Sequence, residues 1–351
     1  MKYALFTLFY LLLFNLIIYR FSVFQFRNFK PIVTILLFNI KFLAGIALWF
    51  IYTFYYTNSA TSDVHKFYNS AVSLHQFAFY NPTSFANLLF ERYDLQSVEF
   101  TNNLPFWTRN FDELPFNENH LIIKLNALLL FLPLHTYFVH VLFFCFASLI
   151  GLVLIVNSIL KFTSFQNSIL VLPVLLLPSV LFWTSGILKE PLLILGIGLL
   201  LSSILTFDFS IKTVLKFSTG VGLILLTKFI VIACLLPAAI TYLLFLKLQN
   251  PKIIVLKYGL INGMFLLLAF GIQFVIPQLN PIQILANKQA NAIKEATYFK
   301  AGSFIEITPL THQPASIIKA GCESICNSLF RPYLWEAKTS LMFANALENI
   351  L

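Results

Sequence analysis

Residues 31–56 read PIVTILLFNIKFLAGIALWFIYTFYY, an apolar stretch in which Lys41 is the only charged residue. A helix rises ~1.5 Å per residue, so a stretch of this length crosses the ~30 Å hydrocarbon core of a bilayer. The rest of the chain has the same character, because 59% of its 351 residues are hydrophobic and 11% are charged. Soluble domains carry about 25% charged residues. The sequence therefore predicts an integral membrane protein and excludes a soluble cytoplasmic enzyme.

Further apolar runs predict an all-α bundle of about eight membrane-spanning helices. The first run, 3–19, is followed by basic residues and lacks the small-residue cleavage site of a signal peptide, so we expect an anchor with its amino terminus outside. The run 217–246 is too long for one helix and contains Lys228 and Pro237, so we divide it in two. The expected spans are 3–19, 31–56, 136–160, 167–183, 191–206, the two halves of 217–246, and 253–277. Residues 121–134 are expected to lie as a helix at the membrane interface.

Charge places two polar segments on the same side of the membrane. Residues 57–120 hold seven of the chain's 14 acidic residues, whereas the turns expected on the opposite side are basic. Because Lys and Arg collect in cytoplasmic loops, 57–120 and 278–335 are predicted to lie outside. The predicted parts are thus an anchor with a basic loop (1–30), a membrane core with the outer loop 57–120 (31–277), and an outer segment with an incomplete last helix (278–351). The net charge of +9 does not indicate nucleic acid, because membrane proteins collect Lys and Arg in their cytoplasmic loops; membrane lipids are the expected partners.

The first candidate for chemistry is Asp63, in the sequence TSDVH of residues 61–65. It follows the second span, so its carboxylate is expected just above the outer face of the membrane. A carboxylate at an apolar boundary ionises less readily, which suits a general base. The structural alternative is an ordinary helix N-cap, a position that Asp often occupies.

The second candidate is the turn PSVLFWTSGILKEP of residues 178–191, which places a cation and an anion side by side. Lys189 is suited to a phosphate, and Glu190 to a sugar hydroxyl or a metal ion. The alternative is a capped span, because Pro191 fits the first turn of a helix and Glu190 faces its positive end.

Other charged residues lie within or beside apolar sequence. Lys228 is a functional candidate because a cation in a membrane span is costly, although it can also extend to the interface. Lys41 and Lys124 are expected to reach lipid headgroups. Arg331 and Glu336 belong to FRPYLWEA (330–337), which fits either an interfacial aromatic belt or a grip on a lipid phosphate. Residues 302–309 alternate like a short strand.

Together these features resemble multispanning glycosyltransferases of the C-type superfold (GT-C) and the bacterial polysaccharide polymerases grouped with them. The resemblance covers roughly 31–340 and rests on short motifs: the span ending in Tyr-Tyr before Ser62-Asp63, the 178–191 turn, the span with Gly220, Lys228 and Pro237, and FRPYLWEA. It implies transfer of a sugar from a polyprenyl-phosphate-linked donor to a glycan acceptor on the outer face. By position, Asp63 matches the essential acid of the first outer loop and Glu190 an acid of the second.

The resemblance also implies an inverting reaction in which Asp63 takes the acceptor's proton and cations hold the leaving phosphate. If Lys189, Lys228 and Arg331 bind one phosphate, they must converge within about 10 Å of Asp63. No cofactor is expected, because Lys189 stands where a second acid would support a metal ion. The absence of an N-x-[ST] sequon with a permitted middle residue favours a bacterial protein of the plasma (inner) membrane. The chain stops where related proteins continue through further spans.

Two other classes of function stay open at this point. A transporter or flippase would use the intramembrane lysines along a pathway, although such proteins usually show pseudo-symmetric halves that this sequence lacks. A non-enzymatic subunit of a polysaccharide assembly system would use the outer segments as docking surfaces.

Overall fold

The computed structural model describes residues 2–56, 62–102, 104, 107, 117–132, 136–163, 172–206, 208, 210–245, 251–277, 280–298, 304–311 and 313–350. Every regular element within these ranges is a helix, so the all-α prediction is confirmed. The strand expected at 302–309 is wrong where it can be examined: residues 304–309 have no regular structure, and 302–303 lie outside the described residues. A strand needs a partner to pair its backbone groups, and no second strand occurs in the described ranges.

The chain divides into two compact units. The first comprises Met1–Thr108 and Pro115–Cys234, and the second comprises Arg109–Leu114 and Leu235–Leu351. This division follows contacts between residues, whereas the predicted parts 1–30, 31–277 and 278–351 follow charge and hydropathy.

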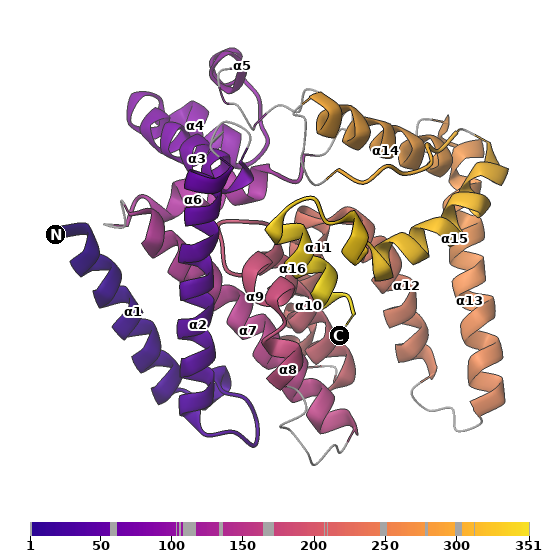
Figure 1. The fold of residues 1–351 in the computed structure, drawn as a ribbon, viewed down its shortest axis with the longest axis horizontal. Helices are drawn as coiled ribbons and strands as arrows, with labels where there is room; N and C mark the ends of the chain where they lie inside the picture. Colours follow the sequence, from indigo (N-terminus) through magenta and orange to yellow (C-terminus); the bar gives the residue numbers. More distant parts are fainter. Residues whose placement is uncertain are drawn as a thin grey trace. The chain divides into compact units, whose positions relative to one another are not determined.

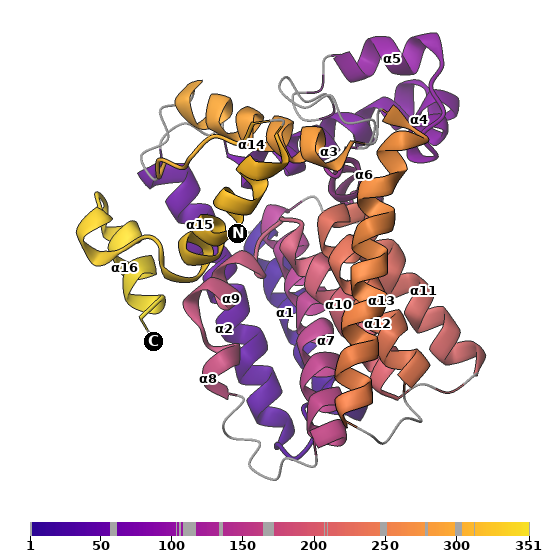
Figure 2. The same ribbon diagram turned by 90° about the vertical axis from the view of Figure 1, so that its right-hand side faces the viewer.

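In the first unit, α1, α2, α7, α10 and α11 form a bundle, and α3 to α6 gather at one end of it (Figures 1 and 2). Its helices are α1 Lys2–Arg20, α2 Pro31–Phe50 with a π-helical continuation Ile51–Tyr55, α3 Asp63–Tyr80, α4 Pro82–Leu89, α5 Leu95–Asn102, α6 His120–Leu129, α7 Tyr137–Thr163, α8 Leu172–Leu175, α9 Pro178–Trp183, α10 Glu190–Leu205 and α11 Ile211–Thr227, with a short 3-10 turn at Ser22–Phe24.

Four of the described helices are long and apolar enough to cross a membrane, and by length and composition they identify an integral membrane protein. They are Tyr3–Arg20, Pro31–Tyr55, Tyr137–Lys161 and Ile253–Phe274. Three further apolar helices are shorter: His120–Leu129, Glu190–Leu205 and Phe229–Leu244.

The expected span 167–183 is not one continuous helix. Residues 172–183 form two short helices, α8 and α9, separated around Leu177. Pro178 is the first residue of α9, and Leu177 adopts φ −52° and ψ 129°. A residue before proline is driven out of the helical region by the proline ring, which explains the interruption. The hydropathy pattern does not distinguish proline from the other apolar residues, so the prediction did not include this interruption.

Glycines let three helices of the first unit approach closely. A Cβ added at Gly198 of α10 would lie 2.4 Å from the carbonyl oxygen of Gly151 in α7. A Cβ at Gly220 of α11 would lie 2.8 Å from the backbone nitrogen of Leu200. Small residues at such interfaces are typical of helices that pack within membranes. This packing fixes the helix α10, which begins at Glu190.

The predicted division of the run 217–246 occurs at Lys228, which has non-helical φ and ψ between α11 and α12 (Phe229–Phe245). In the second unit, Asn262 of α13 (Pro251–Gly271) donates to the Thr241 hydroxyl of α12 at 3.3 Å. The remaining elements of this unit are the 3-10 turn Ile272–Phe274, α14 Pro281–Tyr298, α15 Pro314–Phe330, the 3-10 turn Leu334–Glu336 and α16 Ser340–Glu348.

Candidate functional site

A buried non-helical segment joins α9 to α10 and carries Lys189 at its end. Residues 184–189, which we call the α9–α10 connector, leave the helical conformation after Trp183 and return to it at Glu190. Residues 184–188 are buried, whereas Lys189 and Glu190 are partly exposed. Non-helical backbone at membrane depth is stable only where protein or a water-filled cavity covers it. The burial of the connector meets this requirement.

The connector runs along α2. Three of its residues contact α2 in order: Thr184 at Lys41, Ser185 at Gly45 and Gly186 at Leu48. These α2 residues are three or four positions apart and so share one helix face. The contacts begin near the middle of the span Pro31–Tyr55 and proceed toward its carboxyl-terminal end. The connector therefore brings Lys189 and Glu190 to that end.

Lys41 is wholly buried, with 0% of its surface exposed, so the expectation that it reaches headgroups is wrong. Its Nζ donates to the Thr184 carbonyl oxygen at 3.0 Å and also to the Thr184 hydroxyl. Ser148 of α7 donates to the same carbonyl at 2.7 Å, and Cys145 donates to the Ser185 carbonyl at 3.2 Å. Side chains thus supply the donors that the non-helical backbone lacks.

Two ion pairs lie at the Lys189 end of the connector. Lys189 Nζ is 3.6 Å from Glu118 Oε2, and Lys228 Nζ is 3.1 Å from Glu190 Oε1. The structure therefore brings Lys189, Glu190 and Lys228 together within the first unit, each cation with a carboxylate beside it. Glu118 was not among the predicted site residues, because nothing in the sequence pairs a residue before α6 with the connector.

Asp63 is the first residue of α3 and is exposed. Ser62 occupies the N-cap position, so Asp63 is not the cap; its carboxylate lies in the first turn, where the helix dipole favours a negative charge. The Tyr52 phenol lies within electrostatic range of the carboxylates of both Asp63 and Glu190. Asp63 and the connector's end therefore lie at the same end of the bundle.

Aromatic side chains surround the junction of α2, α3 and α7. The Trp49 ring contacts the rings of His65, Tyr137 and Phe138, with centroids 6.3, 6.4 and 5.3 Å apart. The Thr53 hydroxyl and His65 Nε2 form a hydrogen bond of 3.1 Å. Burial lowers the pKa of His65 and so favours a neutral ring at pH 7. These contacts join α3, and with it Asp63, to the end of α2.

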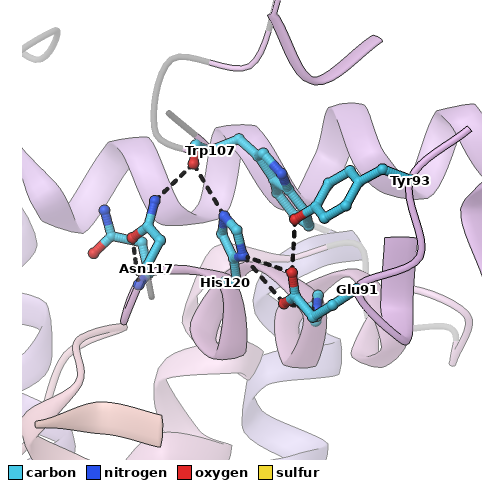
Figure 3. A network of polar contacts seen from close by, with 7 residues as sticks. Glu91, Tyr93, Trp107, Asn117 and His120 are labelled. Atoms are coloured by element: carbon cyan, nitrogen blue, oxygen red, sulfur yellow. Dashed lines mark hydrogen bonds and ion pairs between the residues drawn. The ribbon is translucent and has the colours of Figure 1, made fainter. Parts of the chain in front are cut away.

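A second polar network joins α6 to the residues after α4 and is centred on Glu91 (Figure 3). Tyr93 donates to Glu91 Oε2 at 2.6 Å, His120 Nδ1 lies 3.1 Å from Glu91 Oε1, and Lys124 donates to the same carboxylate. Lys124 therefore binds Glu91, contrary to the expectation that it reaches headgroups. His120 also stacks on Trp107, with ring centroids 4.0 Å apart. Because His120 and Lys124 both belong to α6, the Glu91 carboxylate joins the end of α4 to α6.

Opposing effects set the pKa of Glu91. Partial burial raises it, but the hydrogen bonds from His120, Lys124 and Tyr93 outweigh burial and lower it to about 2. His120 Nε2 lies 3.0 Å from the Trp107 carbonyl oxygen, so both of its ring nitrogens face acceptors. This network stabilises the segment that follows Asp63.

Arg331 and Glu336 bind each other in the second unit. The Arg331 Nε donates to Glu336 Oε1 at 3.0 Å and to Oε2 at 3.1 Å, and Nη1 donates to the Glu306 carbonyl at 3.2 Å. The hydrogen bonds that Arg331 donates to Glu336 raise the pKa of Arg331 and lower the pKa of Glu336. The guanidinium is thus engaged by Glu336 of its own turn and by the Glu306 carbonyl.

The described residues contain no group of three or more His, Cys, Asp or Glu side chains that could hold a metal ion. No known protein family, no curated protein and no solved structure matches this chain. The function of the site is therefore argued from its own residues.

Proposed function

We propose that the protein is a membrane glycosyltransferase of the GT-C kind, with about eight spans, in a bacterial plasma membrane. It transfers a sugar from a polyprenyl-phosphate-linked donor to a glycan acceptor on the outer face, during synthesis of a cell-surface polysaccharide. The observation that supports this proposal is the gathering of Asp63, Glu190 and two lysines at one end of the first unit.

In this proposal Asp63 is the general base. The acceptor hydroxyl oxygen attacks the anomeric carbon, its proton passes to the Asp63 carboxylate, and the bond from that carbon to the phosphate oxygen breaks. The bonding electron pair leaves with the phosphate, and the configuration at the anomeric carbon inverts. The exposure of Asp63 at the start of α3 leaves its carboxylate within reach of an acceptor.

Lys189 and Lys228 stabilise the leaving phosphate, which gains one negative charge as the sugar departs. Both lysines contact carboxylates in the structure, at 3.6 Å and 3.1 Å. The more exposed pair, Lys228–Glu190, contributes only about 0–1 kcal/mol, so a phosphate group can displace its carboxylate. Glu190 then orients Lys228 before the donor binds, or binds a sugar hydroxyl.

Arg331 and Glu336 are the proposed substrate contacts of the second unit. Arg331 is a weak phosphate ligand in this arrangement, because Glu336 already accepts parallel hydrogen bonds from its Nε and Nη2. It contributes to phosphate binding only by releasing part of that interaction.

Reconstitution separates this proposal from its two alternatives. Purified protein in lipid vesicles is given a labelled polyprenyl-phosphate sugar in the outer leaflet and a glycan acceptor. The proposal predicts labelled glycan. Movement of the labelled lipid to the inner leaflet without transfer would identify a flippase. Neither transfer nor movement, with binding to other polysaccharide-assembly proteins, would identify an assembly subunit.

A further inference from the structure

Lys41 binds the start of the α9–α10 connector and has no role in the proposed reaction. Lys41 is the only cation of the span Pro31–Tyr55, and its side chain is wholly buried. A cation at this depth is costly, and extending to the headgroups would reduce the cost. Lys41 instead extends to Thr184, where a carbonyl and a hydroxyl accept its hydrogen bonds. The hydrogen bonds to Thr184 therefore offset the free-energy cost of burying the Lys41 ammonium group.

We propose that Lys41 is a positioning residue that fixes the connector and thereby places Lys189 and Glu190 at the outer end of the bundle. This inference rests on the proposed function only for what Lys189 and Glu190 bind. The placement itself is a property of the first unit and can be measured without any substrate.

The path of the connector leaves little freedom once Lys41 holds its start. A Cβ added at Gly45 would lie 2.3 Å from the Ser185 carbonyl oxygen, and a Cβ at Gly186 would lie 2.4 Å from Leu48. The Ser185 carbonyl is backbone, so Gly45 requires glycine for this contact, whereas the atom that opposes Gly186 is the end of the flexible Leu48 side chain. The connector rests directly on the backbone of α2.

The register of the contacts explains how a residue in mid-span affects the outer end. Lys41 and Tyr52 are about 16 Å apart along the α2 axis at ~1.5 Å per residue. The connector covers this distance in a non-helical conformation from Thr184, at Lys41, to Glu190, near Tyr52. Releasing Thr184 would allow the connector to shorten or slide, and both Lys189 and Glu190 would move.

Zero-length cross-linking tests the placement on the native residues. A carbodiimide activates a carboxylate, and an adjacent lysine amine then forms an amide as the urea leaves. Three pairs in the first unit are suitable: Lys189–Glu118, Lys228–Glu190 and Lys124–Glu91. The first two depend on the connector, and the third contains no connector residue and serves as an internal reference. Mass spectrometry of the full-length protein in detergent quantifies each pair.

Lys41→Met is expected to reduce the first two cross-links about tenfold relative to the third, as suits the loss of a hydrogen bond to a charged group. Gly45→Ala should act in the same direction, because its Cβ would meet the Ser185 carbonyl. Two matched controls should leave all three cross-links unchanged: Lys212→Met, at an exposed position, and Gly222→Ala, where an added Cβ meets nothing within 4 Å.

Unchanged cross-links at Lys189 and Glu190 in both Lys41→Met and Gly45→Ala would overturn the proposal. So would the loss of all three cross-links in both variants, because Lys41 would then support the whole fold. If Lys41→Met alone fails to fold, Gly45→Ala and Ser148→Ala decide the matter.

Where sugar transfer is detected, Lys41→Met should also raise the KM for the lipid-linked donor about tenfold and leave the KM for the acceptor unchanged. A merely structural role would reduce the amount of active protein and lower kcat alone. If the native protein transfers no sugar while the cross-links respond as expected, the proposed function fails and the positioning role stands.

Discussion

Lys228 and Lys189 differ in how firmly their carboxylate partners hold them. The side chains of Lys228 and Glu190 are 44% and 30% exposed, whereas those of Lys189 and Glu118 are each 14% exposed. Water weakens the attraction in an exposed pair, and removing one partner from a more buried pair is costly. Lys228 is therefore the cation that exchanges its carboxylate for a phosphate more readily.

This difference predicts the effect of Lys228→Met on ligand binding. The variant should bind a polyprenyl phosphate about tenfold more weakly, the effect of one lost hydrogen bond between charged groups. Lys212→Met removes the same charge at an exposed position of α11 and should bind like the native protein. Titration of the lipid in detergent, followed by calorimetry, measures both. Equal affinity in Lys228→Met would remove Lys228 from the site.

At the residue scale the sequence could indicate which charges matter, but not their partners. Asp63, Glu190 and Lys228 are conspicuous because charge is rare in an apolar chain. The pairing of Lys189 with Glu118 depends on how α6 and α10 pack, and no local sequence pattern predicts that packing. Lys41 was misjudged for the same reason, since a donor for a buried carbonyl and a lysine that reaches headgroups look alike in sequence.

At the element scale, the contact between α6 and the residues after α4 depends on the ionised Glu91 carboxylate. Its pKa is about 2 in the folded protein against 4.5 for the unperturbed group. A lowered pKa means that the stabilisation is fully present above pH 4.5 and is lost as the pH falls toward about 2. Glu91 also has a φ of 56°, a strained conformation for a residue other than glycine, so these interactions help to hold it there.

We therefore predict that acid releases the stacking of Trp107 on His120. Trp107 fluorescence and the unfolding temperature should both change between pH 4.5 and 2 in the native protein. Glu91→Gln should be less stable at neutral pH and should lack this change, so the two proteins should converge in acid. A native protein and a Glu91→Gln variant with the same pH profile would show that Glu91 does not support the segment.

The elements themselves were predictable where apolar runs are long. The runs 3–19, 31–56 and 253–277 correspond to continuous helices, and the break at Lys228 was expected from a cation within a long run. The run 167–183 failed because Pro178 acts through its steric effect on Leu177, which hydropathy does not register. The buried connector could not be predicted at all, because its carbonyls depend on donors from α2 and α7.

At the scale of the whole molecule, charge asymmetry predicts the orientation in the membrane. Residues 57–120 are acidic and should lie outside, whereas the turn after α10 precedes Lys212 and Lys216 and should lie inside. A reporter enzyme that is active only in the cytoplasm should therefore be inactive when fused after Thr101 and active when fused after Asp208. The reverse pattern would place the candidate site on the cytoplasmic side and would rule out an outer-face donor.

Sugar transfer by an Asp63→Asn variant tests the central claim most directly. The purified variant is compared with the native protein and with Glu99→Gln, which makes the same carboxylate-to-amide change at an exposed position of α5. Loss of a general base should slow transfer from the lipid-linked donor by about 10²–10⁴-fold while membrane insertion stays normal, and Glu99→Gln should act like the native protein. A near-native rate in Asp63→Asn would contradict the account, since Asp63 would then serve only the first turn of α3.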